Sequence, residues 1–345
     1  MNYSVFSKYR LQLFGIAAIL IILYHSINMT FFNISFGVFD KVLNFTDIGV
    51  DIFIFLSAMG LYYSFKKDNN IKKFYLNRIR RVLIPTILLS SIYWILIYIL
   101  KIREGIFNFT LDITTLAFYT RGDRTLWYIP FIMIMYLIYP LIFRIIEKNN
   151  KRVLVLIPIS VLLSFVISNI NNPYYQNIEI ALGRIPIFLL GCYFSKKIFN
   201  NEEIRIQDII SLLVTAIVIF IIYKVYPYSF VKRYIYLTTS ILSIELFARI
   251  LEMIKNKYIN KILSLCGKIS LELYITHILL IRLYENVFLN KFNIVNCNGK
   301  IIYIVIIILS FIISIIFNKL MKVLNNRIDK IQKDNKKLYL ERGEN

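Results

Sequence analysis

The chain is poor in the side chains from which most catalytic and metal sites are built. It has 345 residues, but only two histidines and three cysteines. Cys192, Cys266 and Cys297 are too few and too widely spaced for a disulfide framework or a metal site. No Walker, Rossmann or zinc-hydrolase motif is present, and no internal repeat of the transporter kind is evident. The sequence therefore gives no support for nucleotide hydrolysis, dinucleotide chemistry or a bound metal.

Long apolar runs take the place of these motifs. Hydrophobic residues make up 58% of the chain, and the mean hydropathy is +0.64. Apolar segments of about 20 residues recur from end to end, each long enough to cross a hydrocarbon core. No alternating pattern favours a barrel. The sequence predicts an all-α polytopic membrane protein with about ten transmembrane helices. The expected spans are 11–32, 46–65, 82–100, 126–143, 153–170, 180–195, 208–225, 234–250, 262–289 and 301–318, the sixth being short and the first part of the ninth lying at the interface.

The basic residues are sorted by side. The net charge is +21, and with the N-terminus inside, the inner segments carry 28 Lys and Arg, the outer segments carry 10, and three lie within spans. This split favours two cytoplasmic termini and a multi-pass protein of the cell membrane, with the lipid bilayer as its surroundings and no nucleic acid as a partner. Residues 1–325 are expected to form one membrane domain, and residues 326–345 a charged cytoplasmic tail. Nothing in the sequence indicates an oligomeric state.

Both histidines lie inside apolar runs. A titratable group is costly to bury in a membrane span, and histidine is well suited to proton transfer near neutral pH. His25 lies about 21 Å up the first predicted helix, and Asp51, Arg184 and His277 come to a similar depth at 1.5 Å per residue. The sequence therefore predicts one pocket near the outer face that gathers four ionisable groups.

Five segments read together resemble acyltransferase family 3, a family of integral membrane O-acyltransferases. Their order and spacing match over most of the chain, and a further segment, RIPIFLLGCYFSK from Arg184, is similar to one in family members from low-GC bacteria. The five are GIAAILIILYH ending in His25, GVDIFIFLSAMGLYYS from Gly49, FYLNRIRRVLIP from Phe74, LWYIPFIMIMYLIYPLIF from Leu126 and GKISLELYITH ending in His277.

The resemblance implies transfer of an acyl group, usually acetyl, from cytoplasmic acetyl-CoA to a sugar hydroxyl on a glycan or its lipid-linked precursor. It also implies that His25 is catalytic. The family usually has Arg eleven residues before this His, where this chain has Phe14. Either Arg10 substitutes from about one turn earlier, or this branch does without the guanidinium. Ala58, where the family usually has Gly, is expected to alter packing more than chemistry.

Each candidate catalytic residue has a structural alternative. His25 is interpreted as the general base that accepts the hydroxyl proton, or as a hydrogen-bonded interhelical His. Asp51 either orients an imidazole or satisfies free amides at a helix start. His277 is a positioning or second acid–base residue, or a packed one. Two i,i+4 ion pairs are expected to be structural: Lys268–Glu272 and Glu245–Arg249.

The candidate binding residues also have two readings each. Arg78, Arg80 and Arg81 either hold the phosphates of CoA or follow the positive-inside rule. Arg184 either stabilises an oxyanion or binds an acidic sugar, or it reaches toward the outer surface. Trp127 and Tyr128 either stack on a sugar or belong to an aromatic belt.

Two other classes of function stay open at this stage. A transporter or flippase of a lipid-linked glycan would also need many spans, intramembrane charges and outer aromatics. A membrane sensor or scaffold is a third reading. Consumption of acyl-CoA discriminates between them, because only the enzyme breaks a thioester.

Overall fold

The computed structural model describes residues 2–32, 34–226, 228–292 and 298–343, and within these ranges the chain is helical with no strand. Cys297 of the sequence analysis lies outside the described residues. The all-α fold of a polytopic membrane protein is confirmed. The helices are α1 (Ser4–Lys8), α2 (Arg10–Asn28), α3 (Asp40–Phe45), α4 (Ile48–Lys67), α5 (Ile71–Arg78), α6 (Ile84–Ile99), α7 (Ile106–Ile113), α8 (Ala117–Arg121), α9 (Tyr128–Asn149), α10 (Leu156–Ser168), α11 (Pro173–Leu182), α12 (Ile185–Phe199), α13 (Ile206–Val225), α14 (Ser229–Ile254), α15 (Lys257–Lys268), α16 (Ser270–Leu283) and α17 (Gly299–Gly343).

Every one of the ten predicted spans falls on helix, but fewer helices meet a strict length and hydropathy test. Seven described helical runs qualify, or eight if the bent pair α15–α16 counts as one span. Two of the predicted spans lie in one run, Tyr128–Ser168, which would be about 60 Å long if it were straight and so is long enough for two crossings. A 3-10 segment, Asn150–Val155, separates its two α-helices. α14, on which the eighth predicted span falls, is not among these runs.

The helix α4 lies at the centre of the bundle. It packs against α2, α12 and α14, and Ile52, Phe55, Leu56 and Met59 on it are fully buried. Ala58 is also fully buried, and it faces Gly191 of α12, where a Cβ would lie 2.8 Å from that of Ala58. The position at which the chain departs from the family pattern therefore lies in a helix contact.

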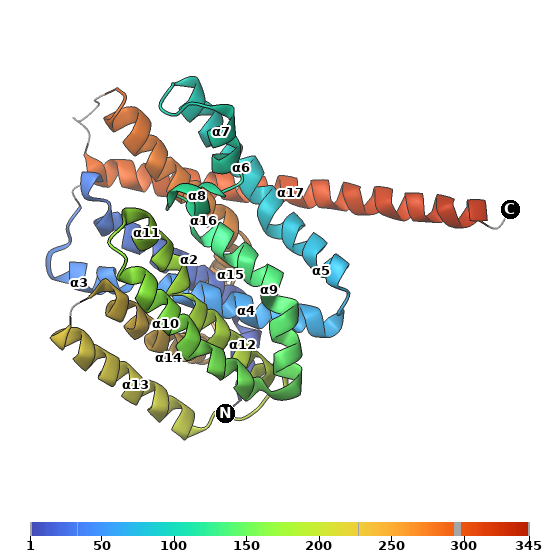
Figure 1. Ribbon diagram of the computed structural model, residues 1–345. Coiled ribbons are helices and arrows are strands. Elements are labelled where there is room, and N and C mark those ends of the chain that lie inside the picture. Colours follow the sequence, from blue (N-terminus) through green and yellow to red (C-terminus); the bar gives the residue numbers. More distant parts are fainter. Residues whose placement is uncertain (1, 33, 227, 293–297, 344–345) are drawn as a thin grey trace.

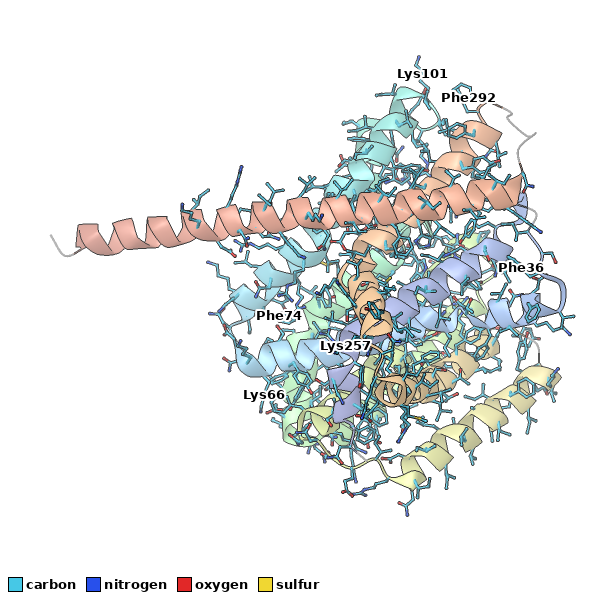
Figure 2. All side chains as sticks on the ribbon, turned by 180° about the vertical axis from the view of Figure 1, so that it is seen from behind. Phe36, Lys66, Phe74, Lys101, Lys257 and Phe292 are labelled. Carbon is cyan, nitrogen blue, oxygen red and sulfur yellow. The ribbon has the colours of Figure 1, made fainter. Side chains whose placement is uncertain are left out.

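The periphery is formed by helices with little buried surface. α13 has no buried residue and lies at the edge of the molecule in Figure 1, so its apolar side chains are free to face lipid. α17 runs behind the bundle and extends past it at its C-terminal end (Figure 1, Figure 2). The residues expected to form a separate tail continue this helix as far as Gly343.

The ninth predicted span is bent. α15 and the helical run Ser270–Leu289 meet at an angle of 67° around Ile269. α15 packs along α2 and α16 packs against α17. Because of this bend, the two halves of the segment have different contacts. α15 packs against α2, and α16 places His277 next to His25.

Candidate active site

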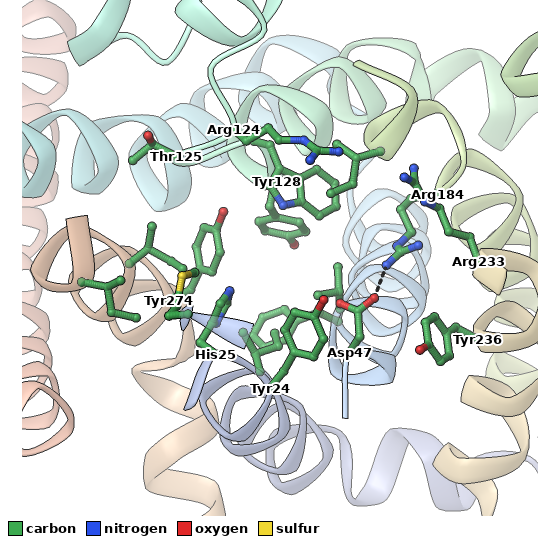
Figure 3. Close-up of a pocket in the computed structure, with 18 of the residues that line it drawn as sticks. Tyr24, His25, Asp47, Arg124, Thr125, Tyr128, Arg184, Arg233, Tyr236 and Tyr274 are labelled. Carbon is green, nitrogen blue, oxygen red and sulfur yellow. Dashed lines mark hydrogen bonds and ion pairs between the residues drawn. The ribbon is translucent and has the colours of Figure 1, made fainter. Parts of the chain in front are cut away.

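A cavity of about 400 Å³ opens between α2, α4, α9, α14 and α16, at the end of the bundle predicted to face outward. His25 and Tyr24 of α2 lie on one wall, with Tyr274 of α16 beside them (Figure 3). Arg184 and Asp47 lie on the opposite side, joined by an ion pair (Figure 3). The wall between them is largely apolar and aromatic, so the cavity combines a few fixed polar groups with a surface suited to a sugar ring.

The two histidines of the chain contact each other. Nε2 of His277 lies 3.2 Å from Nδ1 of His25, although the residues are 252 positions apart in sequence. His277 is 2% exposed and lies behind His25, which is the one of the two that lines the cavity. The predicted gathering of His25 and His277 at one depth is confirmed.

The hydrogen bonds determine which nitrogen of each ring carries the proton. Nδ1 of His277 lies 2.8 Å from the carbonyl oxygen of Leu273. A carbonyl only accepts, so Nδ1 of His277 donates, and Nε2 of the neutral ring is left as an acceptor. Nε2 then receives a hydrogen bond from Nδ1 of His25. Neutral His25 therefore keeps its lone pair on Nε2, the nitrogen available to a ligand in the cavity.

Asp51 and Arg184 form the second buried pair of this region. Nε of Arg184 lies 3.3 Å from Oδ1 of Asp51, and both side chains are almost fully buried. Nη2 of Arg184 also donates to Asp47, at 3.1 Å. Asp51 was expected to orient an imidazole, but its carboxylate forms an ion pair with Arg184, and the ring that contacts His25 is that of His277. Arg184, whose side chain is 3% exposed, does not reach outward to the surface.

The two aromatic candidates line the cavity. Trp127 and Tyr128 both contribute to its wall, and Tyr128 is buried. The hydroxyl of Tyr128 lies 3.2 Å from that of Ser57, which fixes the ring at the edge of α4. The ring of Tyr128 also packs edge-on against Tyr274, with centroids 5.6 Å apart. These positions are inside the protein, not in a lipid-facing belt.

The three arginines of the predicted phosphate site point in different directions. Arg78 turns inward, donates to Ser64 Oγ at 2.7 Å and lies over the rings of Phe74 and Tyr136. Arg80 forms an ion pair with Asp329 of α17 at 3.0 Å. Arg81 is exposed. A π-helical turn at Ile79–Leu83 follows Arg78 and changes the register of the side chains behind it.

Arg10 lies at the same end of the bundle as Arg78. Its Nε donates to the carbonyl of Leu56 at 3.3 Å, and its guanidinium lies 5.1 Å from the centre of the Phe14 ring. The absence of a side chain at Gly60 makes room for it, since a Cβ there would overlap the guanidinium. In the described part of the chain neither Arg10 nor Arg78 has a carboxylate partner. Two inward-facing guanidinium groups without an acid fit the phosphate groups of an acyl-CoA.

Several residues of the site were missed from the sequence, although spacing marks two of them. Asp47 precedes Asp51 by four residues, and Tyr274 precedes His277 by three, so each pair shares a helix face. Lys232, Arg233 and others reach the cavity from α14, a helix whose pattern gives no hint of the site. The residues in question are Tyr24, Asp47, Arg124, Lys232, Arg233, Tyr236, Tyr274 and Arg282.

One of the two expected ion pairs is wrong. Glu245 and Arg249 do pair along α14. Glu272 does not pair with Lys268 in the described structure but accepts a hydrogen bond from Asn318 of α17, at 2.8 Å. The bend at Ile269 is the reason, because it interrupts the helix between the two residues and removes their i,i+4 relation.

Comparison with known families agrees with this arrangement. The family model described as an acyltransferase domain, Acyl_transf_3, matches residues 15–319, which is most of the chain and includes all of the residues that line the cavity. No curated protein and no solved structure matches the chain. The chain belongs to acyltransferase family 3 and is a multi-pass membrane acyltransferase.

Proposed function

We propose that the protein is an O-acyltransferase of the cell membrane that moves an acetyl group from cytoplasmic acetyl-CoA to a hydroxyl of a cell-surface glycan or its lipid-linked precursor. The observation that supports this most is the histidine pair. Its hydrogen bonds leave His25 with an acceptor nitrogen at a cavity wall, as a general base requires. His277 is a positioning residue in this proposal, because it holds the ring and tautomer of His25 without reaching the cavity.

The chemical step needs one proton transfer in each direction. A hydroxyl of the acceptor donates to Nε2 of His25, and its oxygen attacks the thioester carbonyl while the proton moves to the imidazole. A carbon–oxygen bond forms. When the carbon–sulfur bond then breaks, the imidazolium of His25 returns the proton to the departing thiolate. The products are an ester and free CoA, and His25 is neutral again.

Tyr274 is placed to stabilise the negative charge of this step. Its hydroxyl is buried and donates no hydrogen bond to the described residues. The side chain lines the cavity next to His25 (Figure 3) and packs against His277, with ring centroids 6.1 Å apart. A free donor at this position can bind the carbonyl oxygen as it becomes an oxyanion. Asp51 holds Arg184 in place on the opposite wall.

The donor would be held at the other end of α2. Arg10 and Arg78 would bind the phosphates of CoA, with Arg81 at the entrance, and Arg80 is turned away toward α17. Arg10 and His25 are fifteen residues apart, about 22 Å along the helix. The extended arm of acyl-CoA would cover this distance. In this proposal Arg10 has the role of the Arg that the family usually has at the position of Phe14.

The transporter alternative has no observation in its favour. Intramembrane charges and outer aromatics are common to both functions, but a histidine with an acceptor nitrogen at the cavity wall is a requirement of general-base catalysis and not of transport. Membership of an acyltransferase family also favours acyl transfer over transport. Consumption of the thioester remains the discriminating measurement.

The test uses inverted membrane vesicles, which expose the cytoplasmic face to labelled acetyl-CoA. Label is counted in the extracted glycan for wild type, His25→Ala and the control Leu23→Ala, a change on an exposed side chain of the same helix. We expect His25→Ala to lower the rate by at least about 100-fold, the usual contribution of a general base, and Leu23→Ala to leave it unchanged. The same comparison is made with a short panel of other acyl-CoA donors. If wild type and His25→Ala give the same label with every donor, the proposal is wrong.

A further inference from the structure

The cavity beside His25 is rich in basic side chains. Five basic side chains line it, against one carboxylate, Asp47. In Figure 3, Arg184 and Arg233 approach from one side and Arg124 from above. The five are Arg124, Arg184, Lys232, Arg233 and Arg282.

Three of these groups are neutralised by neighbours and two are not. The ion pairs join Arg184 to Asp47 and Asp51, Arg233 to Glu179, and Arg282 to Glu285. Arg124 and Lys232 have no ion-pair partner in the described part of the chain, and Lys232 lies only over the ring of Tyr236, at 5.7 Å. Arg124 and Lys232 are therefore left without an acidic partner, and the five basic groups exceed the four carboxylates of these ion pairs by one charge.

Membrane insertion does not account for this cluster. On the predicted topology the outer segments hold ten of the 41 basic residues, because Lys and Arg are disfavoured on the translocated side. Three of those ten line this cavity, and two of the three basic residues within spans do so as well. Five basic residues thus gather around the cavity that His25 lines.

A buried donor also lacks a partner here. Arg184 is 2% exposed, and its Nη1 has no hydrogen-bond partner among the described residues. An unsatisfied buried donor is costly, so a native structure usually has a ligand or water for it. Arg184 also lines the cavity with Trp127 and Tyr24, whose rings can cover the apolar face of a sugar.

We propose that the acceptor is an anionic saccharide, which binds with its negative group against Arg124, Lys232 and Nη1 of Arg184 and presents a hydroxyl to His25. The negative group is a sugar carboxylate or a phosphate of the glycan, since both offer several oxygens to guanidinium and ammonium donors. The acylation of the acceptor hydroxyl rests on the proposed function. The binding of the negative group does not.

The first experiment tests which glycan is acylated. Envelope glycan is split by anion exchange into a neutral and an anionic fraction, and each is offered with labelled acetyl-CoA to the purified protein. One part of the anionic fraction is carboxyl-reduced and another is dephosphorylated. We expect label in the anionic fraction, and its loss after only one of the two treatments, which identifies the charged group.

The second experiment tests the residues. We expect Arg124→Gln combined with Lys232→Gln to raise the KM for the anionic fraction by about tenfold or more, equivalent to the loss of one or two charged contacts. The KM for acetyl-CoA should not change, whereas Arg78→Gln should raise it. Lys41→Gln serves as the matched control, because Lys41 is an exposed basic residue of the same predicted face that does not line the cavity.

A binding measurement separates this proposal from the proposed function. The His25→Ala protein is expected to turn over too slowly to consume the ligand, so its melting temperature is recorded with the anionic and the neutral fraction, with and without the Arg124 and Lys232 changes. Stabilisation by the anionic fraction alone, lost in the double variant, supports the inference even if no acetyl-CoA is consumed. Equal acylation or equal stabilisation by the neutral fraction, or a double variant that behaves like Lys41→Gln, overturns it.

Discussion

At the residue scale, the direction of a single hydrogen bond decides which nitrogens of His25 and His277 carry protons. The contact of His277 Nδ1 with the Leu273 carbonyl determines the proton positions on both rings. A carboxylate often has this role beside a catalytic histidine, but a carboxylate would also bring a buried negative charge. A neutral histidine orients its neighbour without that cost, which suits a site lined by apolar residues.

The first prediction compares two replacements of His277. In His277→Gln the amide oxygen can still accept from Nδ1 of His25, whereas His277→Leu removes every acceptor. We expect Leu to lower kcat about tenfold to 100-fold and Gln to retain most of it, with little change in either KM. Steady-state acetyl transfer measures both constants. Equal loss in the two variants, with both proteins folded, would show that His277 acts through packing and not through the tautomer.

At the scale of elements, the contact between α2 and α15 fixes the depth of His25. The backbones approach closely at two glycines: a Cβ on Gly267 would overlap the carbonyl of Leu11, and one on Gly15 would overlap that of Leu263. Gly15 and Gly267 thus permit the close approach of the two helices. Because α15 joins α16 at a fixed bend, the same contact also positions His277.

The second prediction follows from this glycine contact. Gly267→Ala must push α15 away from α2, and overpacking of this kind costs about 1–3 kcal/mol. We expect a lower melting temperature of the purified protein and a further loss of acetyl transfer, because the two histidines move apart. Ile262→Ala, at an exposed side chain of α15, is the control and should change neither. An unchanged melting temperature for Gly267→Ala would contradict the close contact.

At the scale of the whole molecule, the ion pairs agree with the predicted sidedness. In each of the described ion pairs given below, the two residues lie at helix ends or in loops that the basic-residue pattern places on the same side of the membrane. On the inner side these are Lys8–Glu252, Lys66–Glu147, Arg80–Asp329 and Lys197–Asp208, and on the outer side Arg103–Asp112, Arg103–Asp123, Arg121–Asp112, Arg184–Asp47, Arg184–Asp51 and Arg233–Glu179.

The third prediction tests which side faces the cytoplasm. Single cysteines replace Lys41, on the histidine side, and Lys72, on the opposite side, in a Cys297→Ser background. Cys192 and Cys266 are buried and should stay silent. We expect a membrane-impermeant maleimide to label Lys41→Cys in intact cells and Lys72→Cys only after permeabilisation. The reverse pattern would place the cavity and His25 on the cytoplasmic side.

The amino-acid sequence by itself determined the class of fold and the helical segments, and it singled out the two histidines as candidates for the chemistry. It could do so for two reasons. In lipid, a long apolar segment forms a helix because its backbone groups must hydrogen-bond with one another, and an ionisable side chain such as histidine is rare in such a segment because it is costly to bury. Family resemblance added the expectation that His25 is the catalytic residue. Only the tertiary structure decided that His277 and not Asp51 contacts His25, that Arg10 lies with Arg78, and that α14 lends basic residues to the cavity. These relations join residues far apart in the chain, and helix packing, which no local pattern records, brings them together.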